Sequence, residues 1–363
     1  METLKVSSPG RICLFGEHQD YLSLPVIACA ISLRVSIEGS RRDDRQVSLN
    51  LPDIGKSIGF SLAGELTYLE DRDYFRSAVN VLLRDGFSFS NGFDCTARGN
   101  IPISAGTSSS SALTAAWVKF LVHMSDGARA LSAEALAEYA YRAEVLEFSE
   151  PGGMMDQYAT ALGGVVLIES HPQIRVSRLP VKMGSIVLGD SLEPKDTMSI
   201  LSRVKRQVFE VCNLVKRKYP AFSLRGAMAG ELDAIAPVLN DEQSQLLRAT
   251  VRNHEITREA AEVLAVQPLD HTRLGALLNE HQQILRDVLR ISTPKIDRMI
   301  AAALAAGAAG AKINGSGGGG CMFAYTADRP EEIARAITKA GGKPYIVQVD
   351  DGTRVESTRW TEG

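Results

Sequence analysis

The feature that most constrains this chain is a short apolar strand that leads through one glycine and four serines into a helix. The segment spans 100–123, with Gly106 at the turn and the serines at 108–111. Because glycine has no side chain, the backbone can turn tightly here and approach a ligand closely. The first turn of the helix offers unpaired N–H groups and the positive end of the helix dipole. Both properties favour the binding of a phosphate group.

An ordinary helix start is the competing interpretation of the same segment. Serine is a favoured N-cap, and many sequences of this kind only begin a helix. No Lys-Ser or Lys-Thr follows the glycine at the spacing of a Walker A loop, which excludes the P-loop NTPases as a model. Other parts of the chain must decide between the two interpretations.

Length and composition narrow the class of protein. A chain of 363 residues is expected to form two domains. The net charge of −3 gives no general basic surface for nucleic acid or an anionic membrane. The longest uncharged, apolar-leaning run, 299–311, is too short to span a bilayer. Five scattered cysteines without a CxxC pair suit a reducing compartment. We expect a cytoplasmic protein without a nucleic-acid or membrane partner, and leave monomer or homodimer open.

Hydrophobic periodicity predicts an alternation of strands and helices, with a change of domain near residue 180. The expected domains are therefore 1–180 and 181–363. Strands are predicted at 4–15, 24–38, 93–98, 164–169, 186–188, 321–325 and 344–349, and helices at 71–85, 109–124, 132–148, 272–289, 294–307 and 330–340.

Two polar segments interrupt this pattern. The segment 16–21, between the first two strands, carries a carboxylate near each end, which is more than a solubilising turn requires. The segment 312–320 contains five glycines between an alanine-rich helix and an apolar strand. A flexible linker is one interpretation of the glycines. Close approach of the backbone to another segment or to a ligand explains the glycines better, because they join elements of one domain, and we favour the ligand.

Three motifs together resemble the GHMP kinases, the family of galactokinase, homoserine kinase, mevalonate kinase and phosphomevalonate kinase. The segment 8–21, with its Gly-Glu-His-x-Asp-Tyr sequence, is similar to the first signature in its galactokinase form. The segment 102–111 resembles the ATP loop, and 312–321 the third, glycine-rich motif. The stretches 143–157 and 279–297 also resemble galactokinase segments.

The resemblance implies an α+β fold of two domains. The first would be an ATP-binding N-terminal α+β domain and the second a ferredoxin-like C-terminal domain, with the active site in the cleft between them. It also implies a kinase that uses ATP and Mg²⁺ and a small-molecule sugar as partner, most directly at the anomeric 1-hydroxyl. A mevalonate or heptose phosphate acceptor, or a non-catalytic sugar sensor on the same scaffold, are the alternatives.

The site residues follow from the resemblance, position by position. The residues that match the family motifs fall into three groups, which would contact the sugar, the nucleotide or the metal. They are Glu17, His18, Asp20 and Tyr21 for the sugar; Ser104, Ala105, Gly106, Thr107, Ser108, Ser109, Ser110, Gly315, Gly317 and Gly318 for ATP; and Ser110 with Glu144 for Mg²⁺.

The catalytic pair implied by the resemblance is Asp156 and Arg11. Asp156 would act on the acceptor hydroxyl as a general base or as an orienting charge, and the sequence leaves both open. Arg11 would steady Asp156. Two departures from the family pattern matter. Residues 22–24 replace an Asn-Gly-Gly sequence, which puts galactose itself in question, and Ser111 is an alternative metal ligand to Ser110.

Overall fold

The computed structural model describes residues 2–103, 105–127, 129–195 and 197–360. In this part of the chain, eight strands form one sheet in the order β12-β1-β2-β5-β3-β4, and β6 and β7 extend it from β2. All pairs are antiparallel except β3 with β5. The strands are β1 (Glu2–Phe15), β2 (Val26–Arg41), β3 (Gln46–Leu51), β4 (Lys56–Ser61), β5 (Phe93–Gly99), β6 (Val165–Glu169), β7 (Arg175–Leu179) and β12 (Arg354–Trp360).

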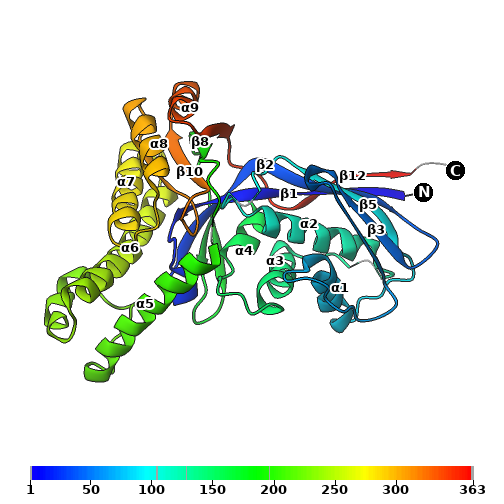
Figure 1. The fold of residues 1–363 in the computed structure, drawn as a ribbon, viewed down its shortest axis with the longest axis horizontal. Coiled ribbons are helices and arrows are strands. Elements are labelled where there is room, and N and C mark those ends of the chain that lie inside the picture. Colours follow the sequence, from blue (N-terminus) through cyan, green and yellow to red (C-terminus); the bar gives the residue numbers. More distant parts are fainter. Residues whose placement is uncertain (1, 104, 128, 196, 361–363) are drawn as a thin grey trace.

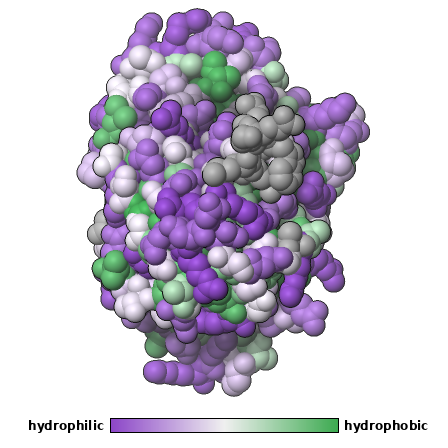
Figure 2. All heavy atoms as spheres, turned by 90° about the vertical axis from the view of Figure 1, so that its right-hand side faces the viewer, coloured by the Kyte–Doolittle hydropathy of each residue, from purple (hydrophilic) through white to green (hydrophobic). Residues whose placement is uncertain are grey.

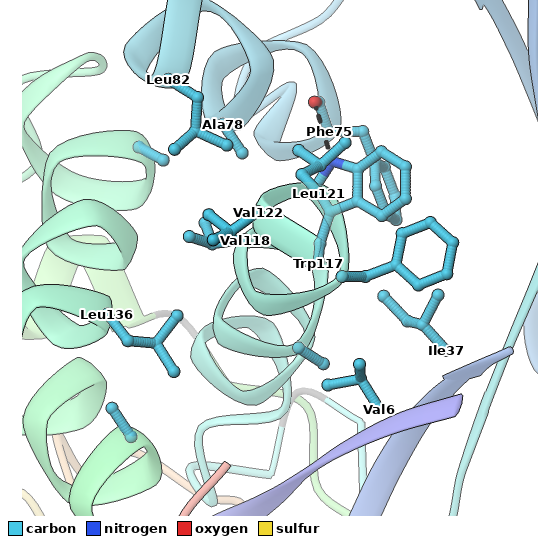
Figure 3. Packing of buried hydrophobic residues seen from close by; sticks show 14 of the residues in the cluster. Val6, Ile37, Phe75, Ala78, Leu82, Trp117, Val118, Leu121, Val122 and Leu136 are labelled. Atoms are coloured by element: carbon cyan, nitrogen blue, oxygen red, sulfur yellow. Dashed lines mark hydrogen bonds between the residues drawn. The ribbon is translucent and has the colours of Figure 1, made fainter. Parts of the chain in front are cut away.

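Four helices cover one face of this sheet (Figure 1): α1 (Tyr74–Arg84), α2 (Ser109–Met124), α3 (Ala133–Tyr141) and α4 (Met155–Leu162). The centre of their packing is Trp117 of α2, which is fully buried. Its indole N–H donates to the carbonyl of Phe75 at 3.1 Å, as the dashed line in Figure 3 shows. Burial of the large ring together with this hydrogen bond fixes α2 against α1. The serine segment at the start of α2 is thereby held on a rigid base.

A second sheet lies in the C-terminal half, with the antiparallel order β11-β8-β10-β9 among the described residues. Numbered along this half, that order is 4-1-3-2, the order of a ferredoxin-like sheet. The strands are β8 (Ser185–Asp190), β9 (Gly310–Ile313), β10 (Cys321–Thr326) and β11 (Lys343–Val347). The expected fold class, α+β with a ferredoxin-like second half, is confirmed.

The remaining long helices stand around the second sheet, at the opposite end of the molecule from the chain termini (Figure 1). They are α5 (Thr197–Lys218), α6 (Asp241–Ala265), α7 (His271–Asp287), α8 (Pro294–Ala305) and α9 (Pro330–Lys339). Short helical turns are η1 (Asp20–Leu22), η2 (Pro52–Ile54), the π-helix η3 (Arg142–Leu146), η4 (Ala229–Ala234) and η5 (Ala236–Val238).

The end of the chain departs from the expected organisation. After β11 the backbone returns to the first sheet, where β12 pairs with β1 from Ser7 to Glu2. From the sequence, the last strand is predicted at 344–349 and none at 354–360. A division near residue 180 remains a prediction, but the last strand packs with the first half.

The face at one end of the molecule is polar. Figure 2 shows the end of the molecule that carries β12, and its atoms are mostly hydrophilic with separate apolar spots. Within the described residues, none of the helices combines the length and the apolar character that crossing a membrane requires.

Candidate active site

A cavity of about 630 Å³ lies between the two halves of the molecule. Asp20, Gly106 and Asp156 line it from the first half, and Lys195 and Ser316 from the second. The segments that the sequence singled out, far apart along the chain, therefore meet at one place.

The start of α2 faces this cavity. Gly106 has a φ of +80°, and Ser108, the N-cap, also lies in the left-handed region with a φ of 56°. The Gly106 carbonyl accepts from Arg11 Nη1 at 2.6 Å and from Asn314 Nδ2 at 2.8 Å. These two bonds hold the loop in place, so that the first N–H groups of α2 and the side chains of 108–111 are presented to the cavity.

Not every residue predicted for the ATP loop lines the cavity. The Ala105 carbonyl accepts from the Cys321 N–H at 2.8 Å. The Thr107 hydroxyl donates to the Pro102 carbonyl at 3.2 Å. Both residues are buried and stabilise the loop from behind. Ser104 lies outside the described residues.

The glycine segment packs closely against other protein segments. Gly315 has a φ of +74° and lines the cavity. A Cβ on Gly317 would lie 2.5 Å from the Ile291 carbonyl, and one on Gly318 would lie 2.0 Å from Ile200 Cδ1. Close approach, the interpretation favoured over a linker, is what the structure has. At Gly317 and Gly318 the approach is to protein rather than to the cavity.

Arg11 and Asp156 form a bidentate ion pair at the centre of the cavity. Arg11 Nε and Nη2 each donate to one carboxylate oxygen of Asp156 at 2.8 Å. Burial raises the pKa of Asp156, but the charge and hydrogen bonds of Arg11 outweigh it and leave that pKa below its usual value. Asp156 is therefore ionised at neutral pH, and its side chain is 31% exposed to the cavity.

Glu144 lies on η3 with no basic side chain bonded to it among the described residues. It is buried, and its Oε2 accepts from Gln157 Nε2 at 2.6 Å. Burial raises its pKa to about 7, although Gln157 and the hydroxyls of Ser110 and Ser111 lower it. No group of three or more His, Cys, Asp or Glu in the described part of the chain could hold a metal. A carboxylate beside two hydroxyls nevertheless fits Mg²⁺, which keeps several waters of its own.

Asp20 brings a second carboxylate to the cavity lining, in addition to that of Asp156. Asp20 comes close to the backbone of the facing loop, because a Cβ on Gly153 would lie only 2.2 Å from its Oδ2. Burial, and next the charge of Asp156, raise the pKa of Asp20 to about 6. Asp20 can accept hydrogen bonds from a polyol, and its protonated form can also donate one.

His18 lines the cavity with both ring nitrogens engaged by protein groups. Nε2 lies 3.0 Å from the Ser316 carbonyl and Nδ1 lies 2.9 Å from the Tyr21 hydroxyl. A carbonyl only accepts, so Nε2 carries the proton and Nδ1 accepts from Tyr21. Burial lowers the pKa of His18 to about 4. The ring is neutral and joins the first motif to the glycine segment, while Tyr21 supports it from outside the cavity lining.

Glu17 is bonded to protein as well. Its Oε1 forms a buried ion pair with Lys312 Nζ, which also donates to the Cys13 carbonyl at 3.1 Å. Its Oε2 lies 3.7 Å from His281 Nδ1. Glu17 also lines the cavity, and its sugar-binding role stays a prediction.

Sequence reasoning missed two features of the cavity. Lys195, between β8 and α5, extends its ammonium group to the serine loop: a Cβ on Gly106 would lie 2.6 Å from Nζ, and one on Gly315 3.6 Å. The second feature is the presence of the apolar side chains of Leu51, Ile54 and Leu113 in the cavity lining. Neither carries a motif. A lone lysine before a basic helix and isolated aliphatic residues look the same as ordinary surface and core.

Family models match three parts of the chain. Residues 2–41 match the galactokinase galactose-binding signature, 73–164 the N-terminal domain of the GHMP kinases, and 260–343 the C-terminal domain of the GHMP kinases. The matches occur in chain order, and they include Arg11, Asp20, Gly106, Asp156 and Ser316 of the cavity lining.

Curated relatives include two kinds of kinase. The chain is 28% identical to the mevalonate kinase of Pyrococcus furiosus over 360 residues, covering 96% of this chain and 97% of that protein. It is also 28% identical to the galactokinase of Haemophilus influenzae over 377 residues, covering 97% and 94%.

Solved structures share the fold. The galactokinase of Lactococcus lactis in complex with galactose has a TM-score of 0.84 at 24% identity, over 97% of this chain and 95% of that one. The mevalonate kinase of Methanococcus jannaschii has a TM-score of 0.74 at 19% identity, over 96% and 98%. The chain belongs to the GHMP kinases, a family of phosphotransferases.

Proposed function

We propose that the chain transfers the γ-phosphate of ATP to the anomeric 1-hydroxyl of a neutral monosaccharide. The observation that carries the proposal is the meeting of Asp20, from the galactose-binding signature, with the Arg11–Asp156 pair in one cavity. Two neighbouring carboxylates provide several acceptors for sugar hydroxyls. They also disfavour an acceptor that carries its own negative charge close to them.

The nucleotide would lie along the rest of the cavity. The N–H groups at the start of α2 suit its phosphates, and the apolar side chains of Leu51, Ile54 and Leu113 suit its base. Glu144 with Ser110 or Ser111 would hold Mg²⁺, since a buried carboxylate beside hydroxyl groups suits a hard cation that keeps several waters. When bound, Mg²⁺ supplies neutralisation of phosphate charge.

Asp156 would act on the acceptor hydroxyl. Phosphoryl transfer proceeds through a loose transition state, in which alignment of the acceptor and charge stabilisation matter most. An ionised carboxylate held in a bidentate pair accepts a hydrogen bond from the hydroxyl and directs its oxygen. Its depressed pKa makes it a weak base, which favours orientation of the hydroxyl over early proton removal.

A coupled ADP-release assay tests the proposal on a panel of neutral hexoses, pentoses, uronic acids and mevalonate. We expect turnover of a neutral aldose, with an acid-labile phosphate on its anomeric oxygen. Asp156→Asn should lower kcat by about 10²–10⁴-fold. The control is Asp287→Asn, an exposed aspartate at the end of α7, which should keep wild-type kcat.

Turnover of mevalonate alone would contradict the sugar acceptor. That second candidate has a specific basis, because the mevalonate kinase of Pyrococcus furiosus is as similar in sequence as the Haemophilus galactokinase. Sugar binding without turnover of any acceptor would contradict a kinase reaction and support the sensor alternative.

A further inference from the structure

The last turn of α4, the helix that carries Asp156, is capped by a segment almost 200 residues away in sequence. The final four carbonyls of a helix have no partner within it and must be satisfied from outside. Here all four have donors, and two of these come from one residue near the chain end, Thr353. The pairs are Ala159 with the Gly163 N–H (3.0 Å), Thr160 with Thr353 Oγ1 (3.0 Å), Ala161 with the Thr353 N–H (3.2 Å) and Leu162 with Arg178 Nη2 (2.7 Å).

The Thr353 hydroxyl connects α4 to β1. It donates its single proton to the Thr160 carbonyl, and Ser8 Oγ lies 2.8 Å from it. Since a hydroxyl has only one proton to donate, Thr353 accepts from Ser8. Ser8 is fully buried on β1, three residues before Arg11. Thr353 thus bonds to both elements that carry the catalytic pair.

The link on the α4 side continues to Asp156 itself. Thr160 is fully buried, and its hydroxyl donates to the Asp156 carbonyl at 2.9 Å. The backbone position of Asp156 is therefore tied to the residue whose own carbonyl accepts from Thr353. On the other side, the Arg11 N–H donates to the Thr107 carbonyl at 3.1 Å, which fixes β1 against the serine loop.

The segment that contains Thr353 has little freedom to move. A Cβ on Gly352 would lie 2.1 Å from the Ala161 carbonyl, so the two backbones are in direct contact. Arg34 holds the same segment, because its Nη1 donates to Asp350 Oδ2 and its Nη2 to the Gly352 carbonyl, both at 2.9 Å. A rigid segment can transmit position, whereas a loose one could not.

We propose that Thr353 is a positioning residue for phosphoryl transfer: its hydroxyl sets β1 against α4 and thereby Arg11 against Asp156. The inference rests on the proposed function for the roles of Arg11 and Asp156, and goes beyond it by assigning the chain end a part in the reaction. A bidentate pair needs both partners in register, and a small displacement of a reacting group lowers the rate steeply.

Kinetics of four variants test the proposal. Thr353→Val keeps the shape and removes the hydroxyl, Thr353→Ser keeps the hydroxyl, and Thr358→Val changes an exposed threonine on the same chain end. We expect Thr353→Val to lower kcat about tenfold with KM for ATP within about twofold, because the pair is displaced while the nucleotide contacts remain. Thr353→Ser and Thr358→Val should keep wild-type kcat. Ser8→Ala removes the other end of the link and should lower kcat like Thr353→Val, which keeps the proposal testable if Thr353→Val does not fold.

Amide hydrogen exchange of α4 gives a second readout that needs no turnover. Removing the Thr353 hydroxyl should speed exchange in 155–163, and Thr358→Val should not. Wild-type kcat in Thr353→Val, or a lower melting temperature with unchanged kcat, would overturn the proposal. If the wild-type chain phosphorylates no acceptor, the proposed function fails. In that case faster exchange would still show that Thr353 holds α4, and unchanged exchange would overturn this inference too.

Discussion

Three carboxyl groups in the cavity have pKa values that their surroundings shift in different directions. Arg11 keeps the pKa of Asp156 low. Burial, and next the charge of Asp156, disfavour the ionised form of Asp20 and raise its pKa to about 6. Glu144 is buried beside an amide and hydroxyls, and its pKa rises to about 7. Because these pKa values differ, one site can hold an ionised group that orients the acceptor beside groups whose protonation responds to a cation or a substrate.

Glu144→Gln tests the raised pKa through stability. A carboxyl whose pKa is higher in the folded state than its ordinary 4.5 opposes folding once it ionises. The destabilisation is absent below about pH 4.5 and complete above about pH 7, where it is roughly 3 kcal/mol. Without metal, we therefore expect Glu144→Gln to raise the melting temperature at pH 8 and to leave it unchanged at pH 4.

The activity of Glu144→Gln should fall, whereas its melting temperature at pH 8 should rise. Loss of the carboxylate removes the Mg²⁺ ligand, so kcat should fall although the protein is more stable at pH 8. Thermal unfolding at both pH values and the ADP-release assay measure the two effects. Glu147→Gln is the control, an ion-paired glutamate just after η3. A lower melting temperature for Glu144→Gln at pH 8 would contradict the sign of the pKa shift.

At the scale of elements, periodicity and caps located most helices and strands. The prediction of a helix start at Thr293-Pro294 is correct, because Thr293 accepts from the Ile296 N–H as the N-cap of α8. The predicted helix at 132–148 instead ends its α-helical part at Tyr141 and continues as the π-helix η3, which carries Glu144. Nothing in local propensity distinguishes a π-turn from an α-turn, since the difference lies in which carbonyl each N–H reaches.

The sequence motifs identified more of the candidate site than hydrophobic periodicity did. What they could not identify has a physical reason. They name Asp156, Arg11 and Asp20, whose side chains do meet in the cavity. They cannot reveal Thr353, whose importance comes from two hydrogen bonds to segments distant in sequence. Nor could they show that Gly153 makes room for Asp20. Contacts of this kind exist only once the chain has folded.

Gly153→Ala tests that contact between the first motif and the loop before α4. The new Cβ would lie 2.2 Å from Asp20 Oδ2, so the carboxylate must move. The backbone of Gly153 is not in the left-handed region, so the substitution adds no strain of its own. We expect KM for the sugar to rise at least about tenfold, by the loss of a charge-assisted hydrogen bond, with KM for ATP unchanged. Initial rates over both substrates measure this.

The neighbouring glycine provides a matched control. A Cβ on Gly152 would meet nothing within 4 Å. Gly152→Ala should therefore keep the wild-type KM for the sugar. Equal effects of the two substitutions would mean that loop stiffness, rather than displacement of Asp20, determines sugar affinity.

At the scale of the whole molecule, the cavity is completed only when both halves of the chain contribute. The first half provides the start of α2, the Arg11–Asp156 pair and Asp20. The second half brings the glycine segment and Lys195 to the same loop. Burial, and next the charge of Arg11, lower the pKa of Lys195 to about 8. In the proposed reaction this ammonium group would lie beside the phosphates, because Lys195 faces the serine loop that is proposed to bind them.

Lys195→Met is expected to separate catalysis from binding. A positive charge aimed at a developing phosphate charge acts mainly in the transition state, so kcat should fall about 10²–10³-fold while KM for the sugar changes little. In the wild type, kcat/KM should decline as pH rises through about 8, because the Lys195 ammonium group of the free enzyme loses its proton. Lys195→Arg keeps its charge, and its residual activity should lack this decline. Lys216→Met, an exposed cation near the end of α5, is the control. An unchanged kcat in Lys195→Met would mean that the first half alone stabilises the transferred phosphate, and that the second half only closes the cavity.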